Sequence, residues 1–124
     1  MIARLGHLKL PVSDLVASRR FYSSALGALG WELVYEGDVS LGYGIGDHEP
    51  FALEQTSAPS VGTHVAFDAP DEATVDAFYA AALDAGGRDN GPPGTRPYGG
   101  YYYAAFVLDP DGHNIEAVFH GDPD

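Results

Sequence analysis

Residues 7–30, HLKLPVSDLVASRRFYSSALGALG, recur 57 residues later as residues 64–87, HVAFDAPDEATVDAFYAAALDAGG. The two segments align without a gap and share eight identities in 24 positions, where a composition rich in Ala and Gly would give roughly two. The first residue of each copy is a histidine, His7 or His64. Because two copies of one unit bring equivalent side chains together when they pack, the repeat predicts one site assembled from distant parts of the chain.

Each copy has the pattern of a strand followed by a helix. In residues 6–12 apolar and polar side chains alternate, which turns His7 and Lys9 away from the apolar side, and His64 has the same place in residues 63–69. Apolar residues then recur with helical spacing in both copies. The helices are expected to begin at the caps Ser13 or Asp14 and Asp71 and to end at Gly30 and Gly86-Gly87.

Short apolar runs separated by turn residues follow each helix and predict further strands at residues 31–36, 39–44, 50–55, 101–108 and 113–119. The segment from Arg88 to Gly100 is rich in Gly and Pro, so we interpret it as a loop that can hold a short strand. The sequence therefore predicts an α+β fold of two βαβββ modules, at about residues 1–57 and 62–120. Both modules are expected to lie in a single domain of residues 1–124, because 124 residues suffice for one core.

Composition narrows the class of protein. The chain has no cysteine, which excludes disulfides, thiolate metal sites and a catalytic Cys. Its net charge of -12 argues against a nucleic-acid partner. The acidic surface is either simply solvated or attracts a metal cation or a cationic small molecule. No stretch approaches the roughly 20 apolar residues of a membrane span, so we expect no membrane partner and a cytoplasmic location.

The first and last strands of each half carry side chains of metal-ligand type. Aligning Glu54 with Glu116 moves the repeat offset from 57 to 62, which a five-residue insertion in the Gly/Pro loop would explain. Together with His7 and His64 they give two imidazoles and two carboxylates, which suit one divalent ion such as Zn²⁺, Ni²⁺, Co²⁺, Mn²⁺ or Fe²⁺. The alternative for Glu54, which precedes Gln55, is plain solvation. The remaining histidines are interpreted as surface residues: His48, His113 and His120.

Three segments, residues 6–36, 63–87 and 106–118, resemble the vicinal oxygen chelate superfamily of glyoxalases, bleomycin resistance proteins and extradiol dioxygenases. The features that carry the resemblance are the strand, Asp and Phe-Tyr helix, their repeat, and the sequence DPDGHNIE. The resemblance implies a cupped eight-stranded mixed sheet with helices on its outer face, commonly in a homodimer. It also implies that the metal ligands of glyoxalase I-like members correspond to His7, Glu54, His64 and Glu116.

This resemblance implies a chemistry as well. A metal that is chelated by two neighbouring oxygens of a small substrate stabilises the enolate or oxyanion that forms in a lyase or isomerase reaction. A metal-bound glutamate acts as the base in glyoxalase I-like enzymes, and Glu116 matches that position better than Glu54. Candidates to line the substrate pocket are Lys9, Tyr98, Tyr101 and Tyr103. For the tyrosines, the alternative is simple packing of a Tyr-rich strand.

Two functions stay open from the sequence. One is a metal-dependent glyoxalase-like lyase or isomerase, and the other is a non-catalytic protein that sequesters a drug or metabolite, as bleomycin-binding members do. The six basic residues argue against glutathione-dependent glyoxalase and fosfomycin-transferring activities, which need more cations. Whether the modules pair within one chain or across a dimer is also open.

Overall fold

A computed structural model describes residues 3–59 and 62–121. The first module comprises β1 (Leu8–Val12), α1 (Leu15–Ala28), β2 (Glu32–Glu36), β3 (Ser40–Ile45) and β4 (His48–Gln55). The second comprises β5 (His64–Asp68), α2 (Glu72–Asp84), β6 (Arg88–Asp89), β7 (Gly94–Thr95), β8 (Tyr102–Leu108) and β9 (Asn114–His120). The expected α+β fold of two modules is confirmed, while the ends of the predicted domain and part of the linker, residues 1–2, 60–61 and 122–124, lie outside the described residues.

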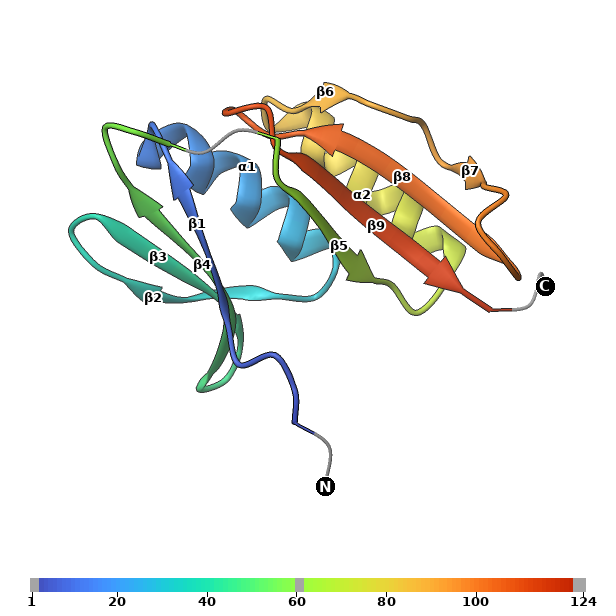
Figure 1. Ribbon diagram of the computed structural model, residues 1–124, viewed down its shortest axis with the longest axis horizontal. Coiled ribbons are helices and arrows are strands. Elements are labelled where there is room, and N and C mark those ends of the chain that lie inside the picture. The colour runs from blue at the N-terminus through green and yellow to red at the C-terminus, as the bar shows by residue number, and fades with distance from the viewer. Residues whose placement is uncertain (1–2, 60–61, 122–124) are drawn as a thin grey trace.

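The strands form two sheets, which lie side by side (Figure 1). Sheet 1 has the order β1-β4-β3-β2, and sheet 2 has the order β5-β9-β8-β6 with β7 also paired to β8. Within the described residues no backbone pairing joins the two sheets, so the cupped eight-stranded mixed sheet of the sequence analysis is not confirmed as one sheet. The reason is that β1 and β5 are the facing edges and each pairs only with the last strand of its own module.

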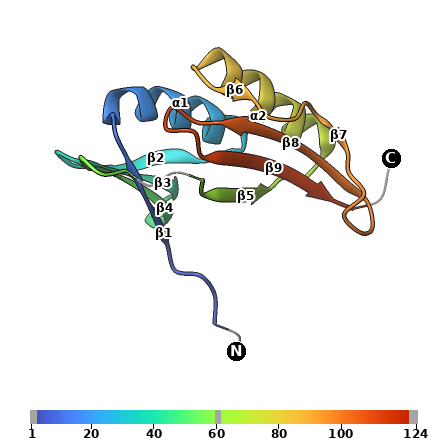
Figure 2. The same ribbon diagram turned by 45° about the horizontal axis from the view of Figure 1, so that its top comes forward.

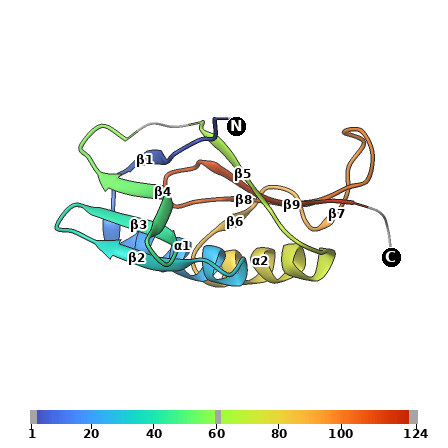
Figure 3. The ribbon, with the colours of Figure 1, turned by 90° about the horizontal axis from the view of Figure 1, so that it is seen from below.

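Both helices cover the same side of the sheets, as the views in Figure 2 and Figure 3 show. Their beginnings are fixed by the predicted caps: the Asp14 carboxylate accepts the backbone N–H groups of Val16 and Ala17, and the Asp71 carboxylate accepts that of Thr74. Gly30 and Gly86, which follow the helices, have φ values of 91° and 99° and allow the chain to turn back toward its sheet.

One core extends across both modules. The Phe51 ring lies between Tyr22 of α1 and Phe67 of β5, with centroid distances of 5.3 and 5.4 Å, and Trp31 contacts Phe67 at 5.3 Å. Helices α1 and α2 also contact each other. This shared core places the sheets in a fixed relation, with their helix-covered faces inside and the opposite face of each sheet, here called the open face, directed away from the helices.

No helix in the described ranges is long and apolar enough to cross a lipid bilayer.

Candidate functional site

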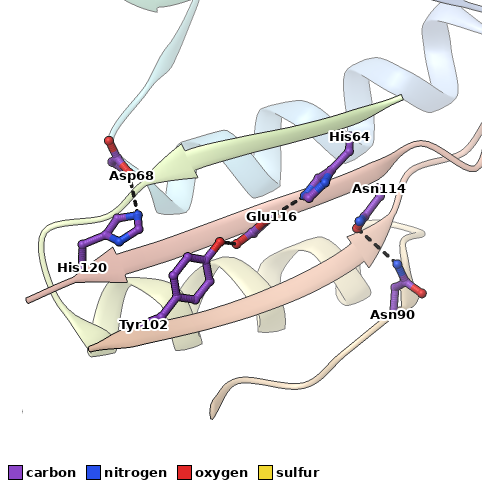
Figure 4. A network of polar contacts seen from close by, with 7 residues as sticks. All are labelled: His64, Asp68, Asn90, Tyr102, Asn114, Glu116 and His120. Atoms are coloured by element: carbon purple, nitrogen blue, oxygen red, sulfur yellow. Dashed lines mark hydrogen bonds and ion pairs between the residues drawn. The ribbon is translucent and has the colours of Figure 1, made fainter. Parts of the chain in front are cut away.

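Glu116 lies at the centre of the open face of sheet 2. Its side chain is buried, with 1% of the residue exposed. The Oε1 atom lies 2.7 Å from Nε2 of His64 on β5, and Oε2 accepts a hydrogen bond from the Tyr102 hydroxyl on β8 (Figure 4). The two strands that flank β9 therefore supply the partners of this carboxylate, as a buried charged group requires.

Tyr102 is a neutral hydrogen-bond donor in this arrangement. Burial first, and then the hydrogen bond to Glu116 and its charge, raise the pKa of Tyr102 to about 12. Its ring is packed edge-on against Tyr98 at 5.1 Å and against His120 at 4.9 Å. The contacts with Tyr98 and His120 hold the Tyr102 ring so that its hydroxyl stays on Glu116. The raised pKa keeps this hydroxyl protonated at neutral pH.

The open face of sheet 1 carries the other predicted ligands. The Lys9 Nζ atom lies 3.0 Å from Oε1 of Glu54, and both side chains are about half exposed. His7 precedes β1 and is exposed. No three of the four predicted ligands of the described chain have ligand atoms within 4.8 Å of one another. One chain thus brings His64 to Glu116, and separately Lys9 to Glu54.

The strand pairing identifies the structural counterpart of Glu116 in the first module. Glu116 pairs with Ala66, and Lys9, which is equivalent to Ala66 in the 57-residue repeat, pairs with Ala52. The counterpart is therefore Ala52, and Glu54 lies two residues further along the same face. The offset of 62 in the sequence analysis is wrong and should be 64 in the last strand.

A second carboxylate occupies the space beside Ala52. Gly42 pairs with Ala52, and a Cβ atom on Gly42 would lie 2.1 Å from the Cδ and Oε1 atoms of Glu49. The Glu49 side chain therefore lies over Gly42 on the open face, which only a residue without a side chain permits. Sequence reasoning did not single out Glu49, because its position depends on the missing side chain across the strand pair.

The candidate substrate tyrosines divide between the two faces. The hydroxyls of Tyr101 and Tyr103 donate to Glu72 and Asp76 of α2, on the helix side of the sheet. The structure does not bring them to Glu116. Tyr98 is exposed and contacts the Tyr102 ring. Tyr102 is the functional candidate that the sequence analysis missed, although strand alternation with Glu116 and His120 was available as a signal.

A third group of titratable side chains lies at the β8–β9 turn. The ligand atoms of Asp109, Asp111 and His113 lie within 4.8 Å of one another. His113 is fully buried, so its interpretation as a surface residue is wrong, whereas His48 and His120 are exposed as expected. The physical reason is that His113 directly precedes β9 and continues its alternation, which puts the side chain on the same side as the core residues Ile115 and Ala117.

An apolar cleft of about 310 Å³ lies between the two modules. Trp31 and Phe51 line it from the first module, and Val65, Ala66 and Asp68 line it from β5. Since Ala66 pairs with Glu116, the cleft borders the strand that carries the site. A small apolar molecule would fit this volume.

Comparison with known proteins gives a consistent picture. A profile of the family described as "Glyoxalase/Bleomycin resistance protein/Dioxygenase superfamily" matches residues 4–117. No curated protein matches this sequence significantly.

Solved structures resemble the chain over nearly its full length. A glyoxalase/bleomycin resistance protein from Albidiferax ferrireducens is 30% identical with a TM-score of 0.83, covering 93% of this chain and 98% of its own. A glyoxalase-related enzyme from Fulvimarina pelagi is 25% identical with a TM-score of 0.75, covering 96% and 89%. A variant of glyoxalase I from Zea mays, at 23% identity and a TM-score of 0.72, covers 96% of this chain and 45% of its own, and shows the shared fold alone.

Proposed function

This chain belongs to the glyoxalase/bleomycin resistance protein/dioxygenase superfamily, and from that premise we propose that it is a divalent-metal-dependent lyase or isomerase of glyoxalase type. Its substrate is a small molecule with two vicinal oxygens. The observation that carries the proposal is the buried Glu116 carboxylate, which is held between His64 and Tyr102 on an open sheet face.

The donor atoms around Glu116 fit a metal ion. An imidazole nitrogen and a carboxylate oxygen already lie 2.7 Å apart, and both are ligands of Zn²⁺ and related first-row ions, at about 2.0–2.2 Å. His64 and Glu116 would hold the ion, and it would act as a Lewis acid toward the substrate oxygens. His7 and Glu54 complete the proposed ligand set.

A second copy of the chain is the source we propose for His7 and Glu54. In one chain Glu54 lies in sheet 1 and His7 directly precedes it, and no three of the four proposed ligands meet among the described residues. A homodimer that places the open face of sheet 1 of one subunit on sheet 2 of the other would assemble the set. Such an interface would also cover Glu54 and its partner Lys9, which are half exposed in the single chain.

The residues of this chain have separate roles in the proposed reaction. Glu116 takes up and returns the substrate proton, because its second oxygen is held by the Tyr102 hydroxyl while the first faces His64. Tyr102 keeps the carboxylate in one orientation. Lys9 offers a positive charge to a developing oxyanion, and Tyr98 offers an aromatic surface beside Tyr102.

Sequestration of a small molecule is a second candidate function. The apolar cleft of about 310 Å³ and the net charge of -12 support binding of a cationic or aromatic compound without chemistry. For both functions we infer a cytoplasmic protein with a small-molecule partner, and no role for nucleic acid or membrane.

Metal analysis separates the two functions. Untagged protein is analysed by plasma mass spectrometry as purified, and again after chelation and reloading with Zn²⁺, Ni²⁺, Co²⁺, Mn²⁺ or Fe²⁺. We expect His64→Ala to bind one ion per chain fewer than the wild type while its circular dichroism spectrum stays unchanged. Loaded protein is then screened with α-ketoaldehyde adducts and other vicinal oxygen compounds. Equal metal binding by the wild type and His64→Ala would refute the ligand assignment, and no metal binding would favour sequestration.

A further inference from the structure

The β8–β9 turn gathers two carboxylates and an imidazole away from the Glu116 site. Asp109 and His113 are 1% and 0% exposed, and Asp111 is half-buried. The three ligand atoms lie within 4.8 Å of one another. His113 lies on the helix side of β9, whereas Glu116 and its partner His64 lie on the open face. The two groups are therefore separated by the sheet.

Neither ring nitrogen of His113 has a hydrogen-bond partner among the described residues, although both are buried. An imidazole has at least one N–H group and, when it is neutral, one lone pair, and both are costly to bury without a partner. Unpaired buried polar groups in native proteins are rare and commonly mark a bound water or ion. Within residues 3–59 and 62–121 no protein group satisfies this ring, so a bound water or ion is the expected partner.

The two carboxylates lack a positively charged partner in the part of the chain that the structure describes. The Asp109 Oδ1 atom accepts the N–H groups of Asp111 and His113, and Oδ2 accepts the Tyr22 hydroxyl at 2.5 Å. The Asp111 carboxylate accepts the N–H of Ser13, at 3.1 and 3.3 Å from its two oxygens. No Lys or Arg of the described ranges forms an ion pair with either residue. Buried charges of this kind are normally paired or bound to a metal.

Enough acceptor capacity remains for an ion. A carboxylate offers about four lone-pair positions, of which the three hydrogen bonds on Asp109 leave one, and Asp111 keeps more. Metal–ligand bonds of about 2.1 Å put donor atoms at most about 4.2 Å apart. Donor atoms that already lie within 4.8 Å need side-chain shifts of well under 1 Å to meet this limit.

We propose that Asp109, Asp111 and His113 bind a divalent cation of the class that takes nitrogen and oxygen ligands, such as Zn²⁺, Co²⁺ or Mn²⁺. Three protein ligands leave the remaining coordination to water. The ion has a structural role, because Asp111 holds the start of α1 through Ser13 and Asp109 holds Tyr22 in the same helix. The ion thereby fixes the β8–β9 hairpin of the second module against α1 of the first module. The proposal does not rest on the function assigned to Glu116.

The experiment measures Co²⁺ and Zn²⁺ binding to the full chain in the His64→Ala background, which removes the other proposed site. Calorimetry and the visible absorption of Co²⁺ report binding, and thermal unfolding reports the structural role of the ion. We expect one ion per chain, a higher melting temperature with the ion, and an affinity at least tenfold lower when Asp111→Asn is added. Asp111 is the residue to change because it is only half-buried. The matched control is Asp68→Asn, an exposed carboxylate on β5, which should bind as the background does.

Nitrogen-15 NMR of the histidine rings gives a second readout that does not depend on a variant. One ring nitrogen of His113 should shift on addition of Zn²⁺. Unchanged His113 signals at saturating Zn²⁺, or equal affinity with and without Asp111→Asn, would overturn the proposal. In that case ordered water satisfies the ring.

Discussion

Glu116 and Ala52 occupy equivalent positions in the last strands of the two modules, each paired with the residue that follows a repeated histidine by two places. The modules are thus alike in backbone and unlike in the chemistry of their open faces. The second module has a carboxylate at this position, and the first has an alanine flanked by Glu49 on one side and Glu54 on the other.

The proposed ligand role of Glu54 can be tested against Glu49. In the proposed site Glu54 leaves Lys9 and binds the ion. Glu54→Gln should therefore lower metal affinity at least 10- to 100-fold, which is the loss that removal of an outer-shell partner of a metal ligand already produces. Glu49→Gln is the matched control, since it removes the same charge from the same strand, and it should change affinity less than threefold. Affinities come from competition with a chromophoric chelator. The reverse result would transfer the ligand role to Glu49.

The raised pKa of Tyr102, which follows first from burial and then from its hydrogen bond to Glu116, predicts an alkaline loss of stability. An unfolded tyrosine ionises near pH 10, while the folded pKa of Tyr102 is about 12. Between these values the unfolded state binds fewer protons, so the free energy of unfolding falls as pH rises from about 10 to 12. Tyr102→Phe should make this fall shallower in urea unfolding between pH 9 and 12. Tyr35→Phe, which removes an exposed hydroxyl of sheet 1, should keep the wild-type slope. An unchanged slope in Tyr102→Phe would contradict the raised pKa of Tyr102.

Local sequence patterns predicted the helices and their caps better than they predicted which strand residues face the site. Helix positions and the caps Asp14 and Asp71 follow from local periodicity and side-chain chemistry, which a single sequence contains. Tyr101 and Tyr103, which the sequence analysis named, lie one residue out of phase with Tyr102, and in a strand a shift of one residue exchanges the two faces. Val107 is buried on the helix side, and because side chains alternate along β8, Tyr103 and Tyr101 share that side while Tyr102 lies on the open face.

The register of the last strand was less accessible. Hairpin and loop lengths between helix and strand determine which residue pairs with Lys9, and an alignment with gaps does not fix those lengths. The separation into two sheets likewise depends on how the β1 and β5 edges pack in the shared core. The positions of Glu49, which lies over Gly42 on the open face, and of buried His113 on the helix side depend on such packing. They therefore could not be predicted from the sequence alone.

Loss of the Tyr22 hydroxyl should destabilise the fold. Tyr22 is fully buried, and its hydroxyl donates to Asp109. Burial, and then the charge and hydrogen bond of Asp109, raise the pKa of Tyr22. Tyr22→Phe leaves one Asp109 oxygen without this donor and should cost about 1–3 kcal/mol in urea unfolding at neutral pH. Tyr98→Phe should stay within about 0.5 kcal/mol of the wild type. An equal stability of Tyr22→Phe and wild type would mean that water replaces the donor.

Gly87 is required by the close approach of the two modules. A Cβ atom there would lie 2.5 Å from Cγ1 of Val107 and 2.6 Å from Cε1 of Phe21. Gly87→Ala should therefore cost about 1–3 kcal/mol through overpacking. Gly27→Ala in α1 meets no atom within 4 Å and should instead stabilise the protein by up to about 1 kcal/mol through helix propensity. Thermal unfolding of both variants checks the pair, and a neutral Gly87→Ala would show that the module contact is looser than described.

Mixing two variants that each lack one proposed metal ligand tests how the proposed site is assembled. In a homodimer that joins sheet 1 of one subunit to sheet 2 of the other, a mixed dimer of His7→Ala and His64→Ala chains has one intact ligand set and one doubly altered set. When the two variants are mixed in equal amounts and exchange subunits, half of the dimers are mixed. Since one of the two sites in each mixed dimer is intact, metal binding should return to roughly a quarter of the wild-type sites. Metal binding is measured after refolding the mixture, with each variant refolded alone as the control.

If the four ligands instead come together within one chain, every site in the mixture carries a substitution and no metal binding is restored. Metal binding that stays at the level of the separate variants would therefore exclude exchange of ligands across the dimer, and would require sheet 1 to close on sheet 2 of its own chain.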